Sequence, residues 1–262
     1  MKPADFFFSR QNINTIIMIT LFSFNYLSRK PIEKAMKEFS KNFPPETKIL
    51  DIGCGDKPYA SYFSCQYIGL DPFPGTKADV QAPAWDLPFK DNEFDGIILN
   101  QSLEHIMKID ATISEIRRVL KQGGLGIITA PQTVRNHSTP IPSQNCEFDN
   151  FDKSAIRYWN NDFYRFTKFG LIYLFRDFQI TILKETSGYF GTIFQLINYF
   201  FASVKEIRVL FTPVFFISNL FGLVFDSFFG MILKIKLPYF REIDEILYRS
   251  LTLNYILIIR KK

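Results

Sequence analysis

The sequence predicts an α/β fold with a mostly parallel sheet, from two short apolar segments and the residues that follow them. Lys48 to Ile52 is too short for a helix, and the glycine turn Gly53-Cys54-Gly55 follows it directly. Glycine suits a turn where backbone approaches a ligand, because it lacks a Cβ and accepts a positive φ. A second short strand, Tyr67 to Leu70, ends at Asp71. In nucleotide-binding α/β folds, an acid at this point accepts hydrogen bonds from ribose hydroxyls.

The remaining elements of the predicted core follow in order along the chain. Ile113, Ile116 and Leu120 recur at helical spacing, so we expect an amphipathic helix over residues 110–121. Asp110 is expected to cap its start and Gly123 its end. The other expected elements are a short helix at 57–63, strands at 94–99, 125–129, 178–185 and 253–260, and a helix capped by Thr167.

Two further regions flank or interrupt that core. The predicted division is an N-terminal helical segment at 1–45, the core at 46–187, an apolar helical insertion at 188–250 and the last core strand at 251–262. In the N-terminal segment, the apolar run 13–27 is shorter than the roughly 20 residues that span a bilayer. We therefore expect a helix that lies on the domain or on a membrane surface. Pro31 can open a second helix, which Pro44 ends.

The insertion contains two apolar runs, Tyr189 to Val204 and Val209 to Phe225. They hold 16 and 17 residues, and a span needs roughly 20. Asp226 would also be costly at the centre of a bilayer. The runs therefore predict an interfacial or re-entrant helical pair on a membrane surface. A helical cap on the domain and a dimer interface are the alternatives.

The composition also points to a partner for the apolar residues. The chain has 262 residues, of which 30 are phenylalanine and 47% are hydrophobic, so part of this apolar mass is expected to contact something other than the core. The net charge of +5 suits an anionic membrane or nucleic acid. An odd number of cysteines without metal-ligand spacing predicts reduced thiols in a cytoplasmic protein: Cys54, Cys65 and Cys146. We expect a cytoplasmic protein, peripheral on the membrane.

The residues around the glycine turn indicate the charge of the ligand. In a nicotinamide dehydrogenase the third position of G-x-G-x-x-G is glycine, whereas Pro58 stands here. Asp51 precedes the first glycine by two residues. A pyrophosphate favours a glycine turn and helix N-terminus without a carboxylate against it. A cationic ligand favours the acid.

The D-x-G-x-G pattern of Asp51, Gly53 and Gly55 resembles that of the class I S-adenosylmethionine-dependent methyltransferases. The resemblance covers residues 46–131 well and 160–185 loosely. It rests further on Leu87-Pro88-Phe89, Asp91, Phe94-Asp95, Leu103-Glu104-His105, Glu115, Arg118-Val119-Leu120-Lys121 and Gly123-Gly124. It implies S-adenosyl-L-methionine as the cofactor and a Rossmann-like, seven-stranded, mostly parallel sheet with helices on both faces, whose last strand is antiparallel.

The resemblance also assigns roles in cofactor binding. It places Asp51 at the cofactor's amino group, Gly53 and Gly55 where backbone approaches the cofactor, and Asp71 at the ribose diol. The backbone of Asn100 would line the methionine end. Asp51, Gly53, Gly55, Asp71 and Asn100 would therefore surround one ligand.

The adenine contact departs from the family pattern. An acid commonly stands four residues before Leu-Pro-Phe, and Pro83 occupies that position here. Asp86 is the predicted replacement. Asp79 and the backbone of Ala84 or Trp85 are the alternatives.

Three residues are predicted on the acceptor side. His105 titrates near neutrality and could act as a general base, although orienting a loop is the alternative. Residues 162–167 resemble a D-x-Y-R-x-T stretch of methyltransferases found among surface-polysaccharide genes. Tyr164 and Arg165 could therefore face the acceptor, and Arg165 would suit a phosphate or carboxylate. An ion pair that anchors the neighbouring segment is the other interpretation of Arg165.

Together these observations predict a methyltransferase that acts on a small-molecule, sugar or lipid-linked glycan acceptor by in-line methyl transfer. A non-catalytic membrane-associated module that retains the fold is the alternative. No nucleic-acid partner is expected, because the lysines cluster near the termini and the insertion and form no basic stripe with interleaved aromatics.

Overall fold

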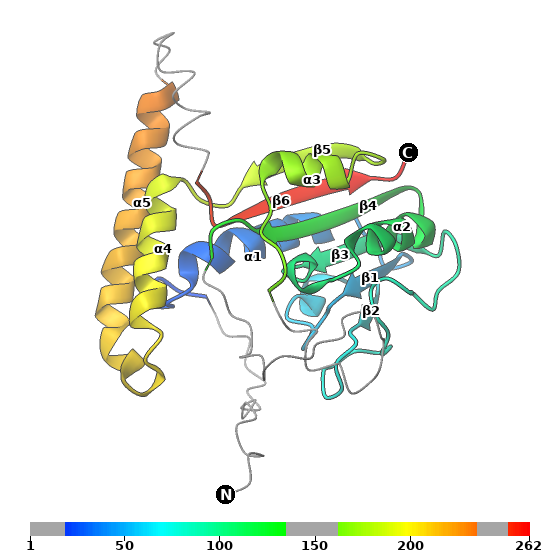
Figure 1. The fold of residues 1–262 in the computed structure, drawn as a ribbon, viewed down its shortest axis with the longest axis horizontal. Coiled ribbons are helices and arrows are strands. Elements are labelled where there is room, and N and C mark those ends of the chain that lie inside the picture. Colours follow the sequence, from blue (N-terminus) through cyan, green and yellow to red (C-terminus); the bar gives the residue numbers. More distant parts are fainter. Residues whose placement is uncertain (1–18, 135–161, 235–250) are drawn as a thin grey trace, which may run out of the picture.

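The computed structural model describes residues 19–134, 162–234 and 251–262, and Cys146 and the other residues lie outside it. The described strands form one six-stranded mixed sheet with helices on both faces (Figure 1). In chain order they are β1 Lys48–Ile52, β2 Gln66–Leu70, β3 Phe94–Asn100, β4 Leu120–Pro131, β5 Gln179–Glu185 and β6 Asn254–Arg260. The helices are α1 Tyr26–Ser40, α2 Ile109–Val119, α3 Lys168–Leu174, α4 Tyr189–Phe201 and α5 Thr212–Lys234.

The strand order is β2-β1-β3-β4-β6-β5. β1 pairs in parallel with β2 and β3, so that Leu50 lies opposite Ile68 on one side and Ile97 on the other. β4 continues the parallel part, and β6 is antiparallel to both of its neighbours. The carboxyl ends of β1 to β5 therefore meet at one edge of the sheet, which is where such folds bind their ligands.

The described sheet has one strand fewer than the seven that the family resemblance implied. The missing strand would lie beside β2, where Val80 forms only an isolated parallel bridge with Leu70. The chain leading there contains Pro72 and Pro74, and proline cannot donate to a strand ladder. The turn-rich stretch after Asp71 thus replaces both an edge strand and its crossover helix.

Helices cover the two faces of the sheet with separate apolar cores. On one face, Met36 and Phe39 of α1 pack against Ile98 of β3. On the other, Ile116 of α2 and Leu171 of α3 belong to the same core as Ile97. Because side chains alternate along a strand, the adjacent residues Ile97 and Ile98 serve opposite cores. Each fully buried side chain of this size contributes roughly 1.5–3 kcal/mol to stability.

Two predicted helix boundaries near the sheet are wrong. The expected helix at 57–63 is reduced to a 3-10 turn, Ala60–Tyr62, because Lys57 has a φ of 54° and Pro58 follows it. The helix predicted at 110–121 ends at Val119, since Leu120 already begins β4. Its N-cap is Lys108, and Gly123 lies within β4.

The N-terminal helix also differs from the prediction. α1 begins at Tyr26 and continues through Pro31, where a new helix was expected to start. Proline lacks the N–H that would bond one turn back, so the helix loses one bond there. The predicted helix over residues 13–27 falls mostly outside the described residues, and turns occupy residues 21–25.

The insertion between β5 and β6 forms a helical hairpin, which we call the α4–α5 hairpin. Its two helices lie side by side and pack on α1 (Figure 1). The chain enters and leaves at one point, where the Thr186 N–H donates to the Asn254 carbonyl at 3.0 Å. The second helix is longer than the predicted run and continues past Asp226 to Lys234. Among the described residues, 207–232 form the one helical stretch, made of the end of a 3-10 segment and most of α5, that is long and apolar enough to cross a membrane.

Candidate functional site

The glycine turn after β1 depends on two glycines for different reasons. Both have a positive φ, 71° at Gly53 and 51° at Gly55. A Cβ on Gly53 would lie 2.4 Å from the Ser102 hydroxyl oxygen, whereas a Cβ on Gly55 would meet no atom within 4 Å. Gly53 is therefore required for packing against the end of β3. Gly55 leaves open space above the backbone, where a ligand can approach.

Ser102 ties the end of β3 to this turn. Its hydroxyl donates to the Asn100 carbonyl at 3.0 Å and to the Gly53 carbonyl at 3.3 Å. The Asn100 side chain points away toward β4, and its Oδ1 accepts from the Thr129 hydroxyl at 2.7 Å. The structure thus places the Asn100 backbone at the predicted edge. The sequence analysis missed Ser102, since neither its type nor its spacing marks it.

Asp51 is a buried carboxylate at the end of β1. It accepts a hydrogen bond from the Tyr67 hydroxyl on the neighbouring strand. Burial raises the pKa of Asp51 to about 7, the Tyr67 bond opposes this shift, and the nearby Asp71 carboxylate adds to it. A cation beside Asp51 would favour its charged form. The site is therefore prepared for a positively charged group.

Asp71 lies at the end of β2 and holds the glycine turn. One of its oxygens accepts from the Gly55 N–H and the other from the Phe73 N–H, both at 2.9 Å. The structure brings Asp51, Gly53, Gly55 and Asp71 together, as the sequence predicted.

The two acids considered for the adenine contact lie in different settings. Asp79 forms an ion pair with Lys57, and it accepts the Gly69 N–H at 2.7 Å. Burial raises the pKa of Asp79, but these two bonds outweigh it and hold the pKa below its usual value. Asp79 thus stabilises the strand end. Asp86 is exposed in the loop before Leu87, and its contact with adenine stays a prediction.

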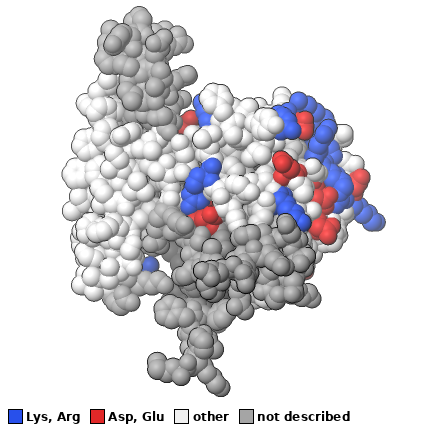
Figure 2. All heavy atoms as spheres, in the orientation of Figure 1, with Lys and Arg blue, Asp and Glu red and all other residues white. Residues whose placement is uncertain are grey.

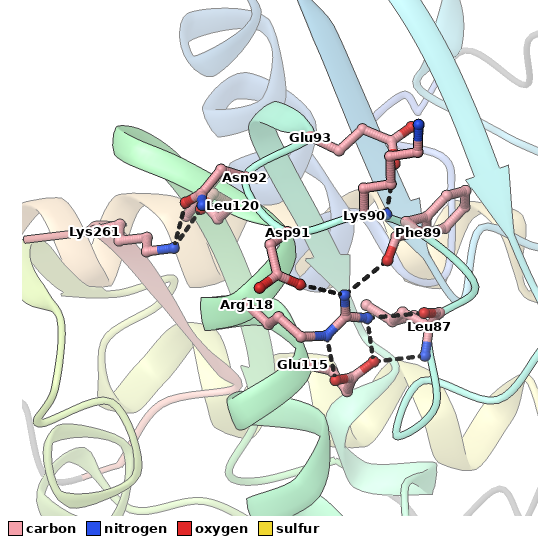
Figure 3. Close-up of polar contacts among 10 residues, drawn as sticks. All are labelled: Leu87, Phe89, Lys90, Asp91, Asn92, Glu93, Glu115, Arg118, Leu120 and Lys261. Atoms are coloured by element: carbon pink, nitrogen blue, oxygen red, sulfur yellow. Dashed lines mark hydrogen bonds and ion pairs between the residues drawn. The ribbon is translucent and has the colours of Figure 1, made fainter.

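Arg118 clamps the loop that follows Asp86 (Figure 3). Its guanidinium donates to the carbonyls of Leu87 at 2.9 Å and Phe89 at 2.7 Å. It also pairs with Asp91 at 2.9 Å and with Glu115 at 2.7 Å. The Leu-Pro-Phe, Asp, Glu and Arg positions of the family motif therefore fix a loop to α2.

The Arg118 clamp lies at the start of β3, whereas the glycine turn follows the end of the parallel strand β1. A surface hollow of about 380 Å³ beside the clamp is lined by residues that include Arg117, Asp177 and Lys261. Asp177 precedes β5 and Lys261 follows the antiparallel β6, so the hollow opens at the amino-end edge of the parallel strands. It is therefore separate from the ligand edge.

A charged cluster joins residues 104–105 to residues 162–165, where the sequence predicted the acceptor to bind. The His105 Nδ1 lies 3.7 Å from an oxygen of Asp162, and its Nε2 lies 3.9 Å from an oxygen of Glu104. Arg165 pairs with Asp162 at 2.8 Å, which is the anchoring ion pair that the sequence analysis considered. The Tyr164 side chain is exposed, and its hydroxyl donates to the Met107 carbonyl at 3.3 Å.

Glu104 is a site residue to which the sequence analysis gave no role. It is only 1% exposed, and its carboxyl oxygens have no hydrogen-bond partner among the described residues. Burial raises the pKa of Glu104 to about 8, and the Asp162 carboxylate adds to this shift. Glu104 is thus mostly protonated at neutral pH. The only indication in the sequence was its place in the Leu-Glu-His motif.

Part of the chain matches a known protein family. A family described as a methyltransferase domain matches residues 50–128, from β1 into β4. The chain carries a class I S-adenosylmethionine-dependent methyltransferase domain. Over 116 residues it is 32% identical to the demethylmenaquinone methyltransferase of Symbiobacterium thermophilum, covering 35% of this chain and 46% of that protein. Over 103 residues it is 31% identical to the fatty-acid O-methyltransferase of Mycolicibacterium smegmatis, covering 31% of this chain and 36% of that protein.

A solved structure extends the likeness beyond the matched stretch. Haemonchus contortus phosphoethanolamine N-methyltransferase 2, in complex with S-adenosyl-L-methionine, has a TM-score of 0.51. The match is 16% identical and covers 92% of this chain and 56% of that chain. It shows the shared fold of the methyltransferase domain. The chain spans less than half the length of these two curated relatives.

The residues at the ligand edge fit the cofactor of a class I methyltransferase domain, which is S-adenosyl-L-methionine. That molecule carries an amino group and a sulfonium, and Asp51 is a buried acid that a cation would return to its charged form. The open space above Gly55 admits a ligand against the backbone. Asp71 stands at the end of β2, where a ribose diol binds in nucleotide folds. The residues present at this edge therefore fit S-adenosyl-L-methionine.

Proposed function

We propose that this chain is an S-adenosylmethionine-dependent methyltransferase that acts on a small-molecule acceptor. The observation that carries the proposal is the meeting of Asp51, Gly55 and Asp71 at the joined ends of β1 and β2. A module that had lost its activity would not need these three groups beside an open backbone. Their retention favours catalysis over the non-catalytic alternative.

When bound, S-adenosylmethionine supplies an electrophilic methyl group and a leaving group that departs as a neutral thioether, so the reaction needs no acid. The residues of the chain then have to bind, orient and exclude water. Asp51 would hold the amino group, and Asp71 the ribose hydroxyls. Ser102 would keep the β3 end against the glycine turn, since its hydroxyl bonds to both.

In this proposal, the charged residues on the acceptor side position the loop of residues 162–165. Residues 162–165 are held against residues 104–105. The Phe163 N–H donates to the Glu104 carbonyl at 2.8 Å, and His105 lies beside Asp162. The His105 imidazole lies between the two segments, 3.7 Å from an Asp162 oxygen and 3.9 Å from a Glu104 oxygen. We therefore assign His105 the role of holding residues 162–165 in position. General-base catalysis is the alternative role.

We further propose that the acceptor has a long apolar part. Two relatives are named for apolar acceptors, demethylmenaquinone and fatty acid. The exposed Tyr164 offers an aromatic surface near the charged cluster. β5 ends at Glu185 on the ligand edge, and α4 begins at Tyr189, so apolar helices start next to that edge. A lipid-linked glycan, which the resemblance of residues 162–167 suggested, fits the same description.

The test is methyl transfer from radiolabelled S-adenosylmethionine into a cell extract that is separated into lipid, glycan, protein and RNA fractions. We expect label in the lipid fraction. The matched pair of variants is Gly55→Ala and Gly123→Ala, because both glycines have a positive φ and open space at the Cβ position. Both changes carry similar backbone strain, but only Gly55 lies at the ligand edge.

Loss of labelling with Gly55→Ala and retention with Gly123→Ala would support the site. Equal labelling by both variants would contradict it. Label in the protein or RNA fraction alone would contradict the small-molecule acceptor while leaving the transferase assignment intact.

A further inference from the structure

Apart from Phe215 and Ala202, the buried side chains of the α4–α5 hairpin are polar or small, and its outward side chains are mostly apolar. The buried positions of α4 are small or polar: Gly191, Thr192, Gln195 and Asn198. Its exposed large side chains are apolar or aromatic: Tyr189, Ile193, Leu196, Ile197 and Phe200. A helix on a water-soluble protein shows the opposite arrangement, with an apolar stripe toward the core. The hairpin is therefore matched to apolar surroundings.

The buried polar groups hold the hairpin together and attach it to the chain before α1. The Asn198 amide donates to the Asn219 side chain at 2.8 Å, which joins the two helices. Asn219 in turn donates to the backbone carbonyls of Leu21 and Ser23, at 2.7 and 2.9 Å. Gln195 donates to the Phe24 carbonyl at 2.6 Å. Polar side chains that bond across helices are how helices associate where lipid removes the hydrophobic driving force.

The single acid of the second helix is also turned inward. Asp226 accepts the N–H groups of Gly188 at 2.7 Å and Gly191 at 3.0 Å, at the first turn of α4. These backbone groups are unsatisfied at a helix N-terminus, and a carboxylate there is favoured. A Cβ on Gly191 would lie 2.4 Å from the Asp226 carboxylate. The charge that argued against insertion in the sequence is thus compensated within the hairpin.

The outward surface is broad as well as apolar. The exposed apolar residues of α5 are Ile217, Leu220, Phe221, Leu223, Val224, Phe225, Phe228 and Met231. At about 100° per residue they cover roughly 200° of the helix circumference. The surface of the hairpin is almost free of charged side chains on the left of Figure 2, whereas the opposite side of the molecule is rich in them. A second copy would cover one patch of such a surface, while a bilayer covers all of its outward side.

The packing of the hairpin on the domain decides how the hairpin can be oriented relative to a bilayer. α5 has 23 residues, about 35 Å of helix, and the hydrocarbon core of a bilayer is about 30 Å thick. Its inner side, however, packs on α1 and on residues 21–24. A spanning orientation would draw the charged α/β core into the hydrocarbon. The helices can instead lie along the membrane plane with their outer side in the acyl layer.

We propose that the α4–α5 hairpin is a monotopic membrane-binding element whose outward surface lies in the acyl layer of a lipid bilayer. Basic residues flank its apolar segments at Lys205, Arg208 and Lys234, and the Arg208 side chain is exposed. This complements the charge of anionic headgroups. The inference stands apart from the proposed methyl transfer, since it depends only on the hairpin.

The experiment is flotation of the full-length protein with vesicles of phosphatidylcholine alone and of phosphatidylcholine with phosphatidylglycerol. We expect the protein to float with both and more strongly with the anionic vesicles. The double variant Phe221→Glu and Phe228→Glu should reduce the bound fraction at least tenfold. The control is Phe169→Glu on α3, which changes a still more exposed phenylalanine away from the hairpin, and it should float like the wild type.

Circular dichroism on every variant separates loss of binding from loss of folding. Because the substituted side chains are exposed, the spectra should match that of the wild type. A wild-type protein that stays soluble with both vesicle types would overturn the proposal, and so would a folded double variant that floats unchanged. If the protein forms a dimer that the double variant dissociates, and neither floats, the surface is an interface between two copies of the chain.

Discussion

The hydroxyl of Tyr67 donates a hydrogen bond to the buried carboxylate of Asp51, so that β2 stabilises the ionised form of the acid at the end of β1. Burial nevertheless raises the pKa of Asp51 to about 7, and the Asp71 carboxylate contributes in the same direction. The charge state of the cofactor site therefore changes close to neutral pH. Two predictions depend on this pair.

Binding of S-adenosylmethionine should weaken as the pH falls below about 7. A cationic amino group favours ionised Asp51, whereas in the free protein Asp51 takes up a proton as the pH falls through its pKa. The affinity should then drop by up to about tenfold per pH unit. Calorimetry at pH 6, 7 and 8 measures this, and Asp51→Asn should bind weakly with little pH dependence. An equal slope in Asp51→Asn would rule out Asp51 as the titrating group.

Removing the Tyr67 hydroxyl should move that titration to higher pH. The hydrogen bond lowers the pKa of Asp51, so Tyr67→Phe should require a more alkaline solution for the same affinity. Tyr62→Phe is the matched control, because the Tyr62 hydroxyl donates to Glu33 instead. If both variants keep the wild-type midpoint, the hydrogen bond does not control the charge of Asp51.

Asp71→Ala should weaken the binding of S-adenosylmethionine more than tenfold, which is about 1.4 kcal/mol. The change removes the proposed acceptor for the ribose hydroxyls and also releases the N–H groups of Gly55 and Phe73. Asp110→Ala, an exposed acid in the first turn of α2, should bind like the wild type. Unchanged affinity in Asp71→Ala would remove the acid from the site, and calorimetry on Asp86→Ala tests the adenine contact in the same series.

Loss of the His105 imidazole should cost less than the roughly 100-fold in rate that removal of a general base costs. Its side chain lies 3.7 Å from Asp162 and 3.9 Å from Glu104, a geometry that suits loop positioning. Steady-state kinetics of His105→Asn, with the affinity for S-adenosylmethionine measured in parallel, gives the answer. A larger fall in kcat with intact cofactor binding would make His105 the base.

Glu104 should make the free energy of unfolding fall with rising pH. Its pKa is about 8 in the folded chain against 4.5 for the free side chain, so between these values the folded state holds a proton that the unfolded state has released. Stability is therefore lost across this window, by on the order of 3 kcal/mol. Urea unfolding of Glu104→Gln at pH 5 and 8 should show a smaller loss, and the exposed Glu46→Gln should match the wild type.

The Arg118 clamp should be worth about 2 kcal/mol, the range for hydrogen bonds to charged groups. Arg118→Ala would leave the carbonyls of Leu87 and Phe89 without this donor and free Glu115 from its partner. Arg117 is the neighbouring residue on α2 and is exposed, so Arg117→Ala provides the comparison. Equal unfolding free energies for the two variants would contradict a structural role for the clamp.

Sequence reasoning was most reliable where a short apolar run ends in a turn or an acid. β1 was predicted with its observed bounds, and Asp51 and Asp71 meet because adjacent parallel strands end at the same edge. It failed where one pattern fits two structures. Leu120 suits both the apolar face of α2 and the start of β4. It belongs to the strand because it pairs with Phe94 of β3.

The residues that were missed act through contacts distant in sequence. Ser102 reaches Gly53 across 49 positions, and Tyr67 reaches Asp51 across 16. No local pattern marks a serine or tyrosine for such a contact. The positive φ of Lys57, which prevented the expected helix, was also not readable, because lysine rarely adopts that conformation.

The bond between Thr186 and Asn254 makes the hairpin a removable module. Since the chain enters and leaves through adjacent strands, the segment between these residues could be replaced by a short turn without altering the register of β5 and β6. The stretch around Leu21 to Phe24 would have to go with it, because its carbonyls bond to Asn219 and Gln195. A chain shortened at both places would be an engineered catalytic core, in which turnover of dispersed acceptors could be measured apart from any attachment to a surface.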